Sequence, residues 1–383
     1  LARQSPLREH NRSYNSASFA SKDYRSVINT KALENADYVF ALDLDGSPGD
    51  ELCRLLRLLP KAGTPVVPII EYQLVCEGEF AKLAGAFQTH VVADVNADGK
   101  EELYFATGYG RGAADAPLSL YRYDDDGLQM IWQRNQTGLR NQITNLYPLP
   151  SGHPLLSKDP VLERGGLYAS MFEKGTMITG GIIATDCPIS MADMDPCWFP
   201  ERSLKMATHQ VPVTVNKRLI ARLYGDAPKS HGGLFEHSAD TNAIKRIPTE
   251  RGVRHLSLTD INSDGHPDAL IADGWHYQYG AQARAQLSLY LGPEYSIRSP
   301  MTHLTGEYTI NVVEAEPMPR GDKPPRLLLT ANKGVYLATP TEVGWMVERL
   351  RDIPEPGNAV FATVGGKTLV YVSGRPTTEI VLR

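Results

Sequence analysis

Short runs of alternating hydrophobic and polar residues, separated by turn-forming residues, recur along most of the chain. Within residues 90–132, four such runs predict four short strands. They are Val91–Ala93, Leu103–Thr107, Leu118–Tyr123 and Leu128–Trp132, with the turn YDDDG at Tyr123–Gly127 between the last two. Strands do not alternate with helical patterns, so a parallel α/β sheet is disfavoured. The pattern is typical of an all-β protein with antiparallel strands.

Two segments of the chain resemble each other closely. HVVADVNADGKEELYFATG occupies His90–Gly108, and LSLTDINSDGHPDALIADG occupies Leu256–Gly274. The second region again predicts strands, at His255–Thr259, Ala269–Ala272 and Gln286–Leu291. Weaker copies of the same frame recur about every 53 residues on average. The first acidic position, or its equivalent, falls at Asp43, Asp94, Pro148, Asp193, Asp260, Glu314 and Thr363.

Four antiparallel strands in every ~40 to 60 residues predict the blades of a β-propeller. We expect one propeller domain over residues 1–383 with seven blades, and six or eight blades are the alternatives. Only 20 residues follow Thr363, which is enough for two strands. Residues 1–36 are therefore expected to supply the missing outer strands. Pairing of the N- and C-terminal strands would close the ring and remove an exposed sheet edge.

Two loops carry oxygen-bearing side chains at the same four positions, which are 1, 3, 5 and 9. A glycine at position 6 permits a sharp reversal of the chain, and the carbonyl at position 7 completes a shell made only of oxygen atoms. This donor set suits Ca²⁺, with about two sites in the chain. The alternative is that Asp, Asn and Gly are simply good turn formers. The residues at positions 1, 3, 5, 6, 7 and 9 are Asp94, Asn96, Asp98, Gly99, Lys100 and Glu102, and Asp260, Asn262, Asp264, Gly265, His266 and Asp268.

The other five frames lack this set of ligands. The pairs Asp43/Asp45 and Asp193/Asp195 keep fragments of it, and the last frame has Gly365 and Gly366 instead. We interpret all of these as turns.

The unit of strand, D-x-N-x-D-G-x-x-[DE], strand and Gly resembles the FG-GAP, or VCBS-type, repeat of integrin alpha-subunit propellers and many secreted or surface proteins of bacteria. Two units match well and about four match weakly, so the resemblance covers most of the chain. It implies a propeller with calcium held between the first and second strands of a blade, a structural role for the ion, and an extracytoplasmic location. The implied ligands are Asp94, Asn96, Asp98, Lys100 and Glu102, then Asp260, Asn262, Asp264, His266 and Asp268. Glu102 stands where Asp is commoner, and its longer reach is expected to loosen that site.

Composition excludes several classes of function. The net charge is −5, without a strongly basic block, so a nucleic-acid partner is not expected. No run of 18 or more apolar residues is present, which excludes a membrane-spanning helix within this chain. The sequence begins with Leu1, so we expect a processed chain whose targeting segment has been removed.

The four cysteines lie at local separations of 23 and 10 residues, which permits two short disulfides. Disulfides would indicate an oxidising compartment, whereas four buried thiols would fit a cytosolic protein. Four cysteines allow three pairings, and these stay open. A soft copper site that includes Met191 and Met194 is a further, less favoured reading of the second pair. The cysteines are Cys53, Cys76, Cys187 and Cys197.

Loops on the face opposite the calcium loops gather aromatic and arginine side chains. Such side chains on glycine-flanked loops suit a sugar or a protein partner. The alternative is that the aromatic rings pack between blades. The candidate ligand-binding residues are Trp275, His276, Tyr277, Tyr279 and Arg284 in the fifth repeat, with Tyr109 and Arg111 in the second.

We therefore expect a non-enzymatic, calcium-stabilised, extracytoplasmic propeller that binds a protein or a glycan, or serves as an accessory subunit. The alternative is an enzyme such as a polysaccharide lyase or hydrolase that uses the central funnel. No catalytic residue is assigned, because no nucleophile, P-loop or zinc motif is present. A fold of this kind hosts many activities, so it does not decide between these hypotheses.

Overall fold

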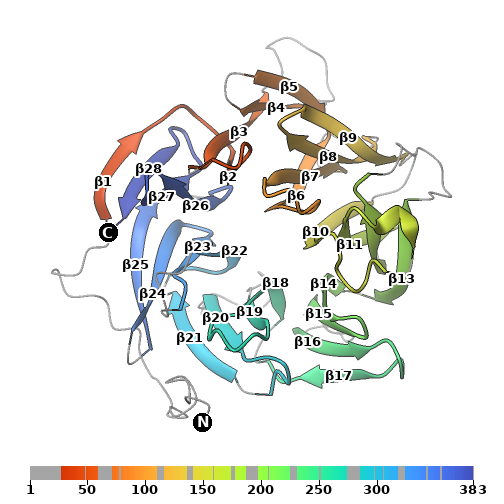
Figure 1. The fold of residues 1–383 in the computed structure, drawn as a ribbon. Helices are drawn as coiled ribbons and strands as arrows, with labels where there is room; N and C mark the ends of the chain where they lie inside the picture. Colours follow the sequence, from red (N-terminus) through yellow and green to blue (C-terminus); the bar gives the residue numbers. More distant parts are fainter. Residues whose placement is uncertain are drawn as a thin grey trace, which may run out of the picture.

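The computed structural model describes residues 27–47, 49–58, 71–76, 79–109, 116–135, 141–157, 159–173, 177–186, 197–205, 207–224, 231–249, 252–273, 285–296, 298–304, 306–317, 324–341, 344–353 and 356–382. The strands in this part form seven antiparallel sheets of four strands each. The sheets stand side by side in a ring around a central axis (Figure 1). The predicted all-β, seven-bladed propeller is therefore confirmed.

The first four blades follow one another along the chain, each running from its innermost to its outermost strand. Blade 1 has β2 (Tyr38–Leu42), β3 (Glu51–Leu58), β4 (Glu71–Cys76) and β5 (Glu79–Ala84). Blade 2 has β6 (Ala86–Ala93), β7 (Glu102–Gly108), β8 (Leu118–Asp124) and β9 (Gly127–Arg134). Blade 3 has β10 (Gln142–Leu149), β11 (Gly166–Glu173), β12 (Met177–Ala184) and β13 (Trp198–Lys205), and a short 3-10 helix, η2 (Pro160–Leu162), follows β10. Blade 4 has β14 (Ala207–Thr214), β15 (Lys217–Tyr224), β16 (His231–Ser238) and β17 (Ile244–Ile247).

The last three blades complete the ring. Blade 5 has β18 (Val253–Thr259), β19 (Asp268–Asp273), β20 (Ala285–Tyr290) and β21 (Arg298–Leu304). Blade 6 has β22 (Ile310–Ala315), β23 (Leu327–Ala331), β24 (Gly334–Thr341) and β25 (Gly344–Asp352). Blade 7 has β26 (Ala359–Val364), β27 (Lys367–Val372) and β28 (Thr378–Leu382), with β1 (Val27–Ala32) as its outermost strand.

The two ends of the chain close the ring by strand pairing. β1 pairs antiparallel with β28, with Thr30 opposite Ile380. The residues before β2 thus provide one outer strand, and the C-terminal segment provides the other three. A buried amide strengthens the junction between blades 7 and 1: Asn358 accepts a hydrogen bond from the Val39 N–H (2.9 Å) and donates one to the Val39 carbonyl (2.6 Å). The predicted pairing of the two ends is confirmed, but the N-terminal residues supply a single outer strand where more than one was expected.

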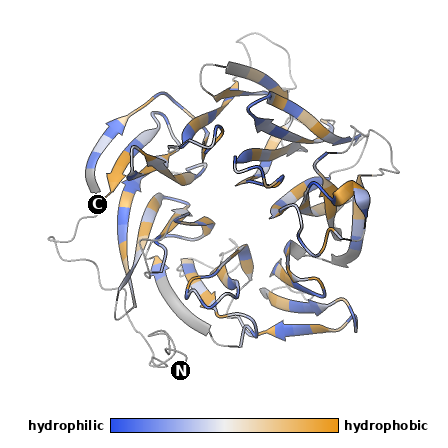
Figure 2. Ribbon diagram, in the orientation of Figure 1, coloured by the Kyte–Doolittle hydropathy of each residue, from blue (hydrophilic) through white to orange (hydrophobic). Residues whose placement is uncertain are grey.

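The hydrophobic core lies between neighbouring blades. Hydrophobic and hydrophilic residues interleave along most strands (Figure 2), as expected when the two faces of each sheet meet different neighbours. One core cluster joins Phe40 and Leu55 of blade 1 to Leu103 and Phe105 of blade 2. Another joins Trp132 of blade 2 to Leu167 of blade 3. Each blade is therefore held mainly by the apolar surfaces of its neighbours.

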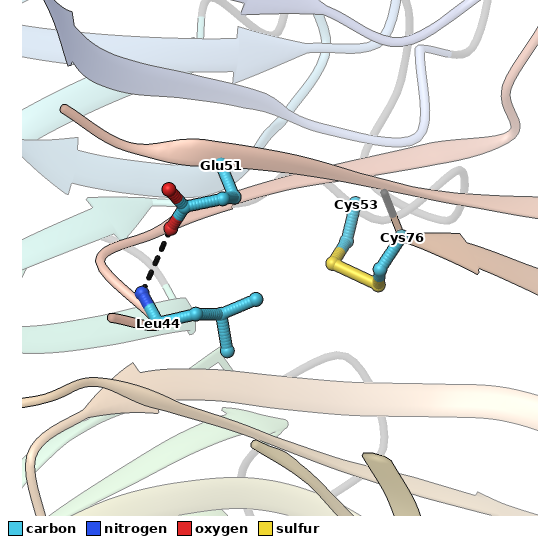
Figure 3. The surroundings of a disulfide bond; sticks show 4 residues. All are labelled: Leu44, Glu51, Cys53 and Cys76. Carbon is cyan, nitrogen blue, oxygen red and sulfur yellow. Dashed lines mark hydrogen bonds between the residues drawn. A yellow bond between two sulfur atoms is a disulfide. The ribbon is translucent and has the colours of Figure 1, made fainter. Parts of the chain in front are cut away.

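One disulfide joins the second and third strands of blade 1. Cys53 on β3 stands opposite Cys76 on β4, with a Cα–Cα distance of 4.3 Å (Figure 3). The structure thus shows the local bridge over the 23-residue separation. Cys197 is buried and also disulfide-bonded, whereas Cys187, Met191 and Met194 lie outside the described residues.

The positions of the repeat frames differ from the expectation in four blades. The residue directly after the innermost strand is Pro150, Glu316 and Gly365 in blades 3, 6 and 7, which is two residues after the positions expected from the sequence. The frame at Asp193 is wrong in a larger way, because β14 forms the innermost strand of blade 4. Asp193 and Asp195 instead lie outside the described residues, between the paired strands β12 and β13 of blade 3. The two-residue connection after β14, Val215 and Asn216, carries no acidic side chain that would mark it in the sequence.

Candidate metal centre

The loop between β6 and β7 in blade 2 folds around the side chain of Asp94. Asp94 accepts hydrogen bonds from the backbone N–H groups of Asp98 (3.1 Å) and Gly99 (2.9 Å). Asp98 in turn accepts one from Lys100 (2.9 Å). Ala97 has a φ of 61° and Gly99 a φ of 90°, so the loop makes the sharp reversal expected of it. These contacts hold the carboxylates at positions 1 and 5 on the inner side of the turn.

Glu102, at position 9, closes this loop from the first residue of β7. Its carboxylate accepts a hydrogen bond from the Val95 N–H (3.0 Å), and the residue is 3% exposed. Asp94, Asp98 and Glu102 can each offer an oxygen such that all three lie within 4.8 Å of one another. Burial raises the pKa of Glu102 to about 7, and the carboxylates of Asp98 and Asp94 add to the increase. Three carboxylates at this separation form a set of hard oxygen ligands.

The loop between β18 and β19 in blade 5 has nearly the same geometry. Asp260 accepts hydrogen bonds from the N–H groups of Asp264 (3.1 Å) and Gly265 (2.8 Å), and Asp264 accepts one from His266 (3.0 Å). Ser263 has a φ of 55°, like Ala97 in blade 2. Two independent stretches of sequence therefore form the same turn, as the repeat predicts.

The two loops differ at position 9. Asp268 accepts hydrogen bonds from the Ile261 N–H (3.0 Å) and the Gly292 N–H (2.8 Å), one on each carboxylate oxygen. Burial raises its pKa to about 6. Within the described residues, Asp268 does not join a group of three ligands as Glu102 does. The longer side chain of Glu102 carries its carboxylate to the other two acids, and the expectation that it loosens the site stays a prediction.

A third loop of this kind lies between β2 and β3 in blade 1, where the sequence suggested only a turn. Asp43, Asp45 and Glu51 can place ligand oxygens within 4.8 Å of one another. Glu51 accepts a hydrogen bond from the Leu44 N–H (2.8 Å), just as Glu102 does from Val95 (Figure 3). Gly46, with a φ of 71°, takes the left-handed position of Ala97.

The sequence did contain a signal for this third loop. Asp43 and Glu51 have the same spacing as Asp94 and Glu102, and Ser47 occupies position 5. The glycine of this loop stands at position 4 and not at position 6, so the match to D-x-N-x-D-G was missed. Cys53, two residues after Glu51 on β3, belongs to the disulfide that ties β3 to β4 behind the loop (Figure 3).

The loops of blades 1 and 2 are in contact. The Glu101 N–H donates to the Asp43 carbonyl (2.7 Å), and the Glu101 carboxylate accepts from the Asp43 N–H (3.0 Å). Beside them, a polar pocket of about 140 Å³ lies between the blade 2 loop and the Asp124–Asp126 turn. Lys100 reaches across it to Asp125 (2.6 Å). The turn thus belongs to the same acidic surface, although its Asp125 and Asp126 are exposed, as expected of a solvated turn.

Two other blades fill the corresponding place with an arginine. In blade 6, Glu316 follows β22 and Arg326 precedes β23, and their buried side chains form a bidentate ion pair (2.9 and 2.6 Å). In blade 4, the guanidinium of Arg218 donates to the carbonyls of Thr214 (2.7 Å) and Val215 (3.1 Å) at the end of β14. The same guanidinium pairs with Glu201 of blade 3 (2.6 Å).

The predicted ligand-binding loops lie mostly beyond what the structure describes. Trp275, His276, Tyr277, Tyr279, Arg284 and Arg111 are all outside the described residues. Tyr109 is described, and its carbonyl accepts hydrogen bonds from Gln88 (3.4 Å) and Gln142 (3.3 Å) on the innermost strands of blades 2 and 3. The connection after β7 therefore begins beside the innermost strands of blades 2 and 3, at the end opposite the acidic loops. Whether these residues bind a ligand stays a prediction.

Comparisons with known proteins reveal the fold but no family. No protein-family profile matches the chain, and no curated protein sequence matches it. The solved structure of BBS1N in complex with ARL6DN is similar, with 12% identity and a TM-score of 0.54 over 93% of this chain and 96% of that chain. The Dos1 propeller aligns with 9% identity and a TM-score of 0.47, over 93% of this chain and 95% of that one. Among the described residues, no helix has both the length and the apolar character that a membrane span requires.

Proposed function

We propose that this chain is a calcium-stabilised propeller of the FG-GAP or VCBS type, which works outside the cytoplasm as a binding module for another protein. The observation that carries the proposal is the arrangement of the innermost loops. Blades 1 and 2 each gather three carboxylates within 4.8 Å without a cation among them, and blade 5 repeats the turn. Blades 4 and 6 hold an internal arginine at the corresponding place.

Charge balance supports an external cation in the acidic loops. Three carboxylates that converge repel one another, and burial of Glu102 removes the water that would screen them. A divalent ion with oxygen ligands relieves this repulsion, and the mixed set of carboxylate, amide and backbone oxygens suits Ca²⁺ better than the stricter Mg²⁺. Nearby Lys100 is a poor substitute, since its ammonium pairs with Asp125 outside the loop.

The disulfides support an oxidising compartment. Cys53 and Cys76 are bonded, and Cys197 is disulfide-bonded as well. Such bonds persist in secreted and periplasmic proteins and are rare in the cytosol. Millimolar calcium is available in the same compartments, so the two features support each other.

A protein partner is the use that best fits this scaffold. Propellers present loops on two broad faces of a rigid ring, and such loops commonly carry binding residues. The propeller BBS1N is similar in fold, and its structure was solved with the protein ARL6DN bound. For this chain, the loops opposite the acidic face, around Tyr109 and residues 274–284, are the proposed contact surface.

Metal analysis together with thermal melting tests the calcium part of the proposal. We expect two to three calcium ions per chain after dialysis, and a lower melting temperature in a chelator. A ligand at one hundred times its dissociation constant stabilises the folded state by about 2.7 kcal/mol per site, so the shift will be large. Calcium must restore the melting temperature, and magnesium at the same concentration must restore less of it. A metal-free chain with an unchanged melt in chelator would overturn the proposal.

The binding surface is tested separately. Replacement of Trp275 and Tyr277 by Ala is expected to weaken partner binding while the calcium-loaded melting temperature stays nearly unchanged. A large loss of stability would show that these rings pack between blades. Retention on immobilised polysaccharide, lost in the same variant, would identify a glycan ligand in place of a protein.

A further inference from the structure

The innermost strands of five blades, which stand around the central axis of the ring, share an irregularity in their pairing. The pairing of β6, β10, β14, β18 and β22 with the next strand shifts by one residue near the start of each strand. A β-bulge of this kind bends the strand and redirects the side chains beside it. In blades 4 and 5 the residue directly after the shift is a histidine, His209 on β14 and His255 on β18.

These two histidines lie next to each other between adjacent blades. Their ring centroids are 5.8 Å apart, with the ring planes at 76°. His209 Nδ1 and His255 Nε2 are both shielded from solvent, and neither has a hydrogen-bond partner among the described residues. A buried ring nitrogen without a partner is costly, and it therefore requires an explanation.

The neighbours of His255 determine which of its ring nitrogens lacks a hydrogen-bond partner. The ring interacts with the backbone of Val313 on β22 through a hydrogen bond that favours the protonated form. Since Nε2 has no partner, this contact falls to Nδ1. A neutral imidazole whose Nδ1 donates to a backbone carbonyl presents a lone pair at Nε2, which is the usual arrangement of a metal-binding histidine.

We propose that His209 and His255 together bind one divalent transition-metal ion, such as Zn²⁺ or Cu²⁺, between the innermost strands of blades 4 and 5. Two imidazoles that share an ion at metal–nitrogen distances of about 2.1 Å have ring centres roughly 5 to 6.5 Å apart. The observed 5.8 Å lies within this range. Nitrogen ligands separate this site from the oxygen-lined loops, because imidazole favours zinc and copper over calcium.

The surroundings of His209 and His255 keep both imidazole rings uncharged. Burial lowers the pKa of His209 to about 3 and that of His255 to about 4. Both rings are therefore neutral at pH 7, as metal ligation requires. The charge of Arg254 opposes a cation near His209, but this exposed side chain donates to Asn311 (3.1 Å) at the solvent side. Water screens a charge in that position.

A third histidine faces the pair from across the ring. His90, on β6 of blade 2, interacts electrostatically with His255, although blades 2 and 5 lie on opposite sides of the axis (Figure 1). The ligand atoms of the three rings do not all fall within 4.8 Å of one another. The preformed unit is therefore the pair.

Zinc titration of the calcium-saturated full chain tests the proposal, because the acidic loops are then filled. Calorimetry is expected to show one Zn²⁺ per chain, and His209→Gln or His255→Gln should weaken its binding by about tenfold or more. The matched control is His153→Gln, since His153 is half-buried but lies in the connection after β10. Undiminished zinc binding in the double variant His209→Gln/His255→Gln would overturn the proposal.

A second measurement uses only the wild-type chain and does not depend on whether the variants fold. Cu²⁺ added to the calcium-loaded protein should give an electron paramagnetic resonance spectrum with nitrogen hyperfine structure from two imidazoles. A spectrum with oxygen ligands alone, or no bound copper, would refute the site. Either failure leaves the calcium proposal intact, because that proposal rests on oxygen ligands in the loops that follow the innermost strands and not on the two histidines.

Discussion

The blade 2 loop and the blade 6 connection differ in the charge of the groups that surround the carboxylate after the innermost strand. Each joins the innermost strand to the second strand, and each places a carboxylate directly after the innermost strand, Asp94 or Glu316. In blade 6 that carboxylate meets Arg326, and the two buried side chains are 5% and 10% exposed. In blade 2 it meets two further carboxylates, Asp98 and Glu102.

The difference shows how a propeller can lose a cation site without losing the blade. In blade 6 the positive charge belongs to Arg326 of the chain itself, so this connection needs no dissolved cation. Under the proposed function, the blade 2 loop depends on an ion whose occupancy follows its concentration. Blade 4 likewise needs no dissolved cation, because the guanidinium of Arg218 is held by backbone carbonyls at the end of β14. The acidic loops are therefore the part of the ring that calcium is expected to control.

The largest expected effect comes from removing the internal cation. Arg326→Ala leaves the buried carboxylate of Glu316 without its partner, which is expected to cost about 3 to 5 kcal/mol of unfolding free energy. The loss should be the same in calcium and in chelator, as urea denaturation can measure. The double variant Glu316→Gln/Arg326→Met is the control and should recover most of the stability. A loss that calcium restores would show that blade 6 also binds the ion.

The next largest effect tests the acidic loops directly. Asp98→Asn keeps an oxygen for the Lys100 N–H but removes one charge, so calcium-saturated protein is expected to lose about 2 to 3 kcal/mol. In chelator the variant should be at least as stable as wild type, because it relieves repulsion with Asp94 and Glu102. Asp264→Asn is the matched change in blade 5. If denaturation of either variant shows equal losses with and without calcium, that loop is only a turn.

Local signals in the sequence were sufficient to predict the strands beside the acidic loops of blades 2 and 5. The predicted strand Leu103–Thr107 became β7, Glu102–Gly108, and the predicted His255–Thr259 became β18, Val253–Thr259. The D-x-N-x-D-G loop fixes where both flanking strands end, so these boundaries could be read from nearby residues.

Other features of the structure could not be predicted, because they depend on contacts between residues that lie far apart in the sequence or on turns without a clear sequence signal. The connection after β14 is a two-residue turn without acidic residues, so the frame search went to Asp193 instead. The Arg218–Glu201 pair joins two blades, and the adjacency of His209 and His255 requires the ring. The loop at Asp43 was missed for a different reason, since its glycine is displaced by two positions while its ligand spacing is intact.

A smaller effect is expected in blade 1, where the third loop has serine at position 5. Glu51→Gln preserves an acceptor for the Leu44 N–H but removes the charge at position 9. We expect the bound calcium to fall by one ion per chain and the calcium-dependent stability to fall by about 1 to 2 kcal/mol. Metal analysis after equilibrium dialysis checks the number. An unchanged ion count would assign this loop to the turns and restrict calcium to blades 2 and 5.

The smallest effect concerns the only cationic side chain within the blade 2 loop. Lys100 pairs with Asp125 at the surface, and an exposed pair of this kind contributes at most about 1 kcal/mol. Lys100→Ala should therefore leave the stability in chelator almost unchanged. It should tighten calcium binding about two- to fivefold at low ionic strength, because a like charge near the ion has been removed. The gain must shrink at high salt, where such repulsion is screened. Weaker calcium binding in this variant would mean that Lys100 shapes the loop and that its charge does not oppose the ion.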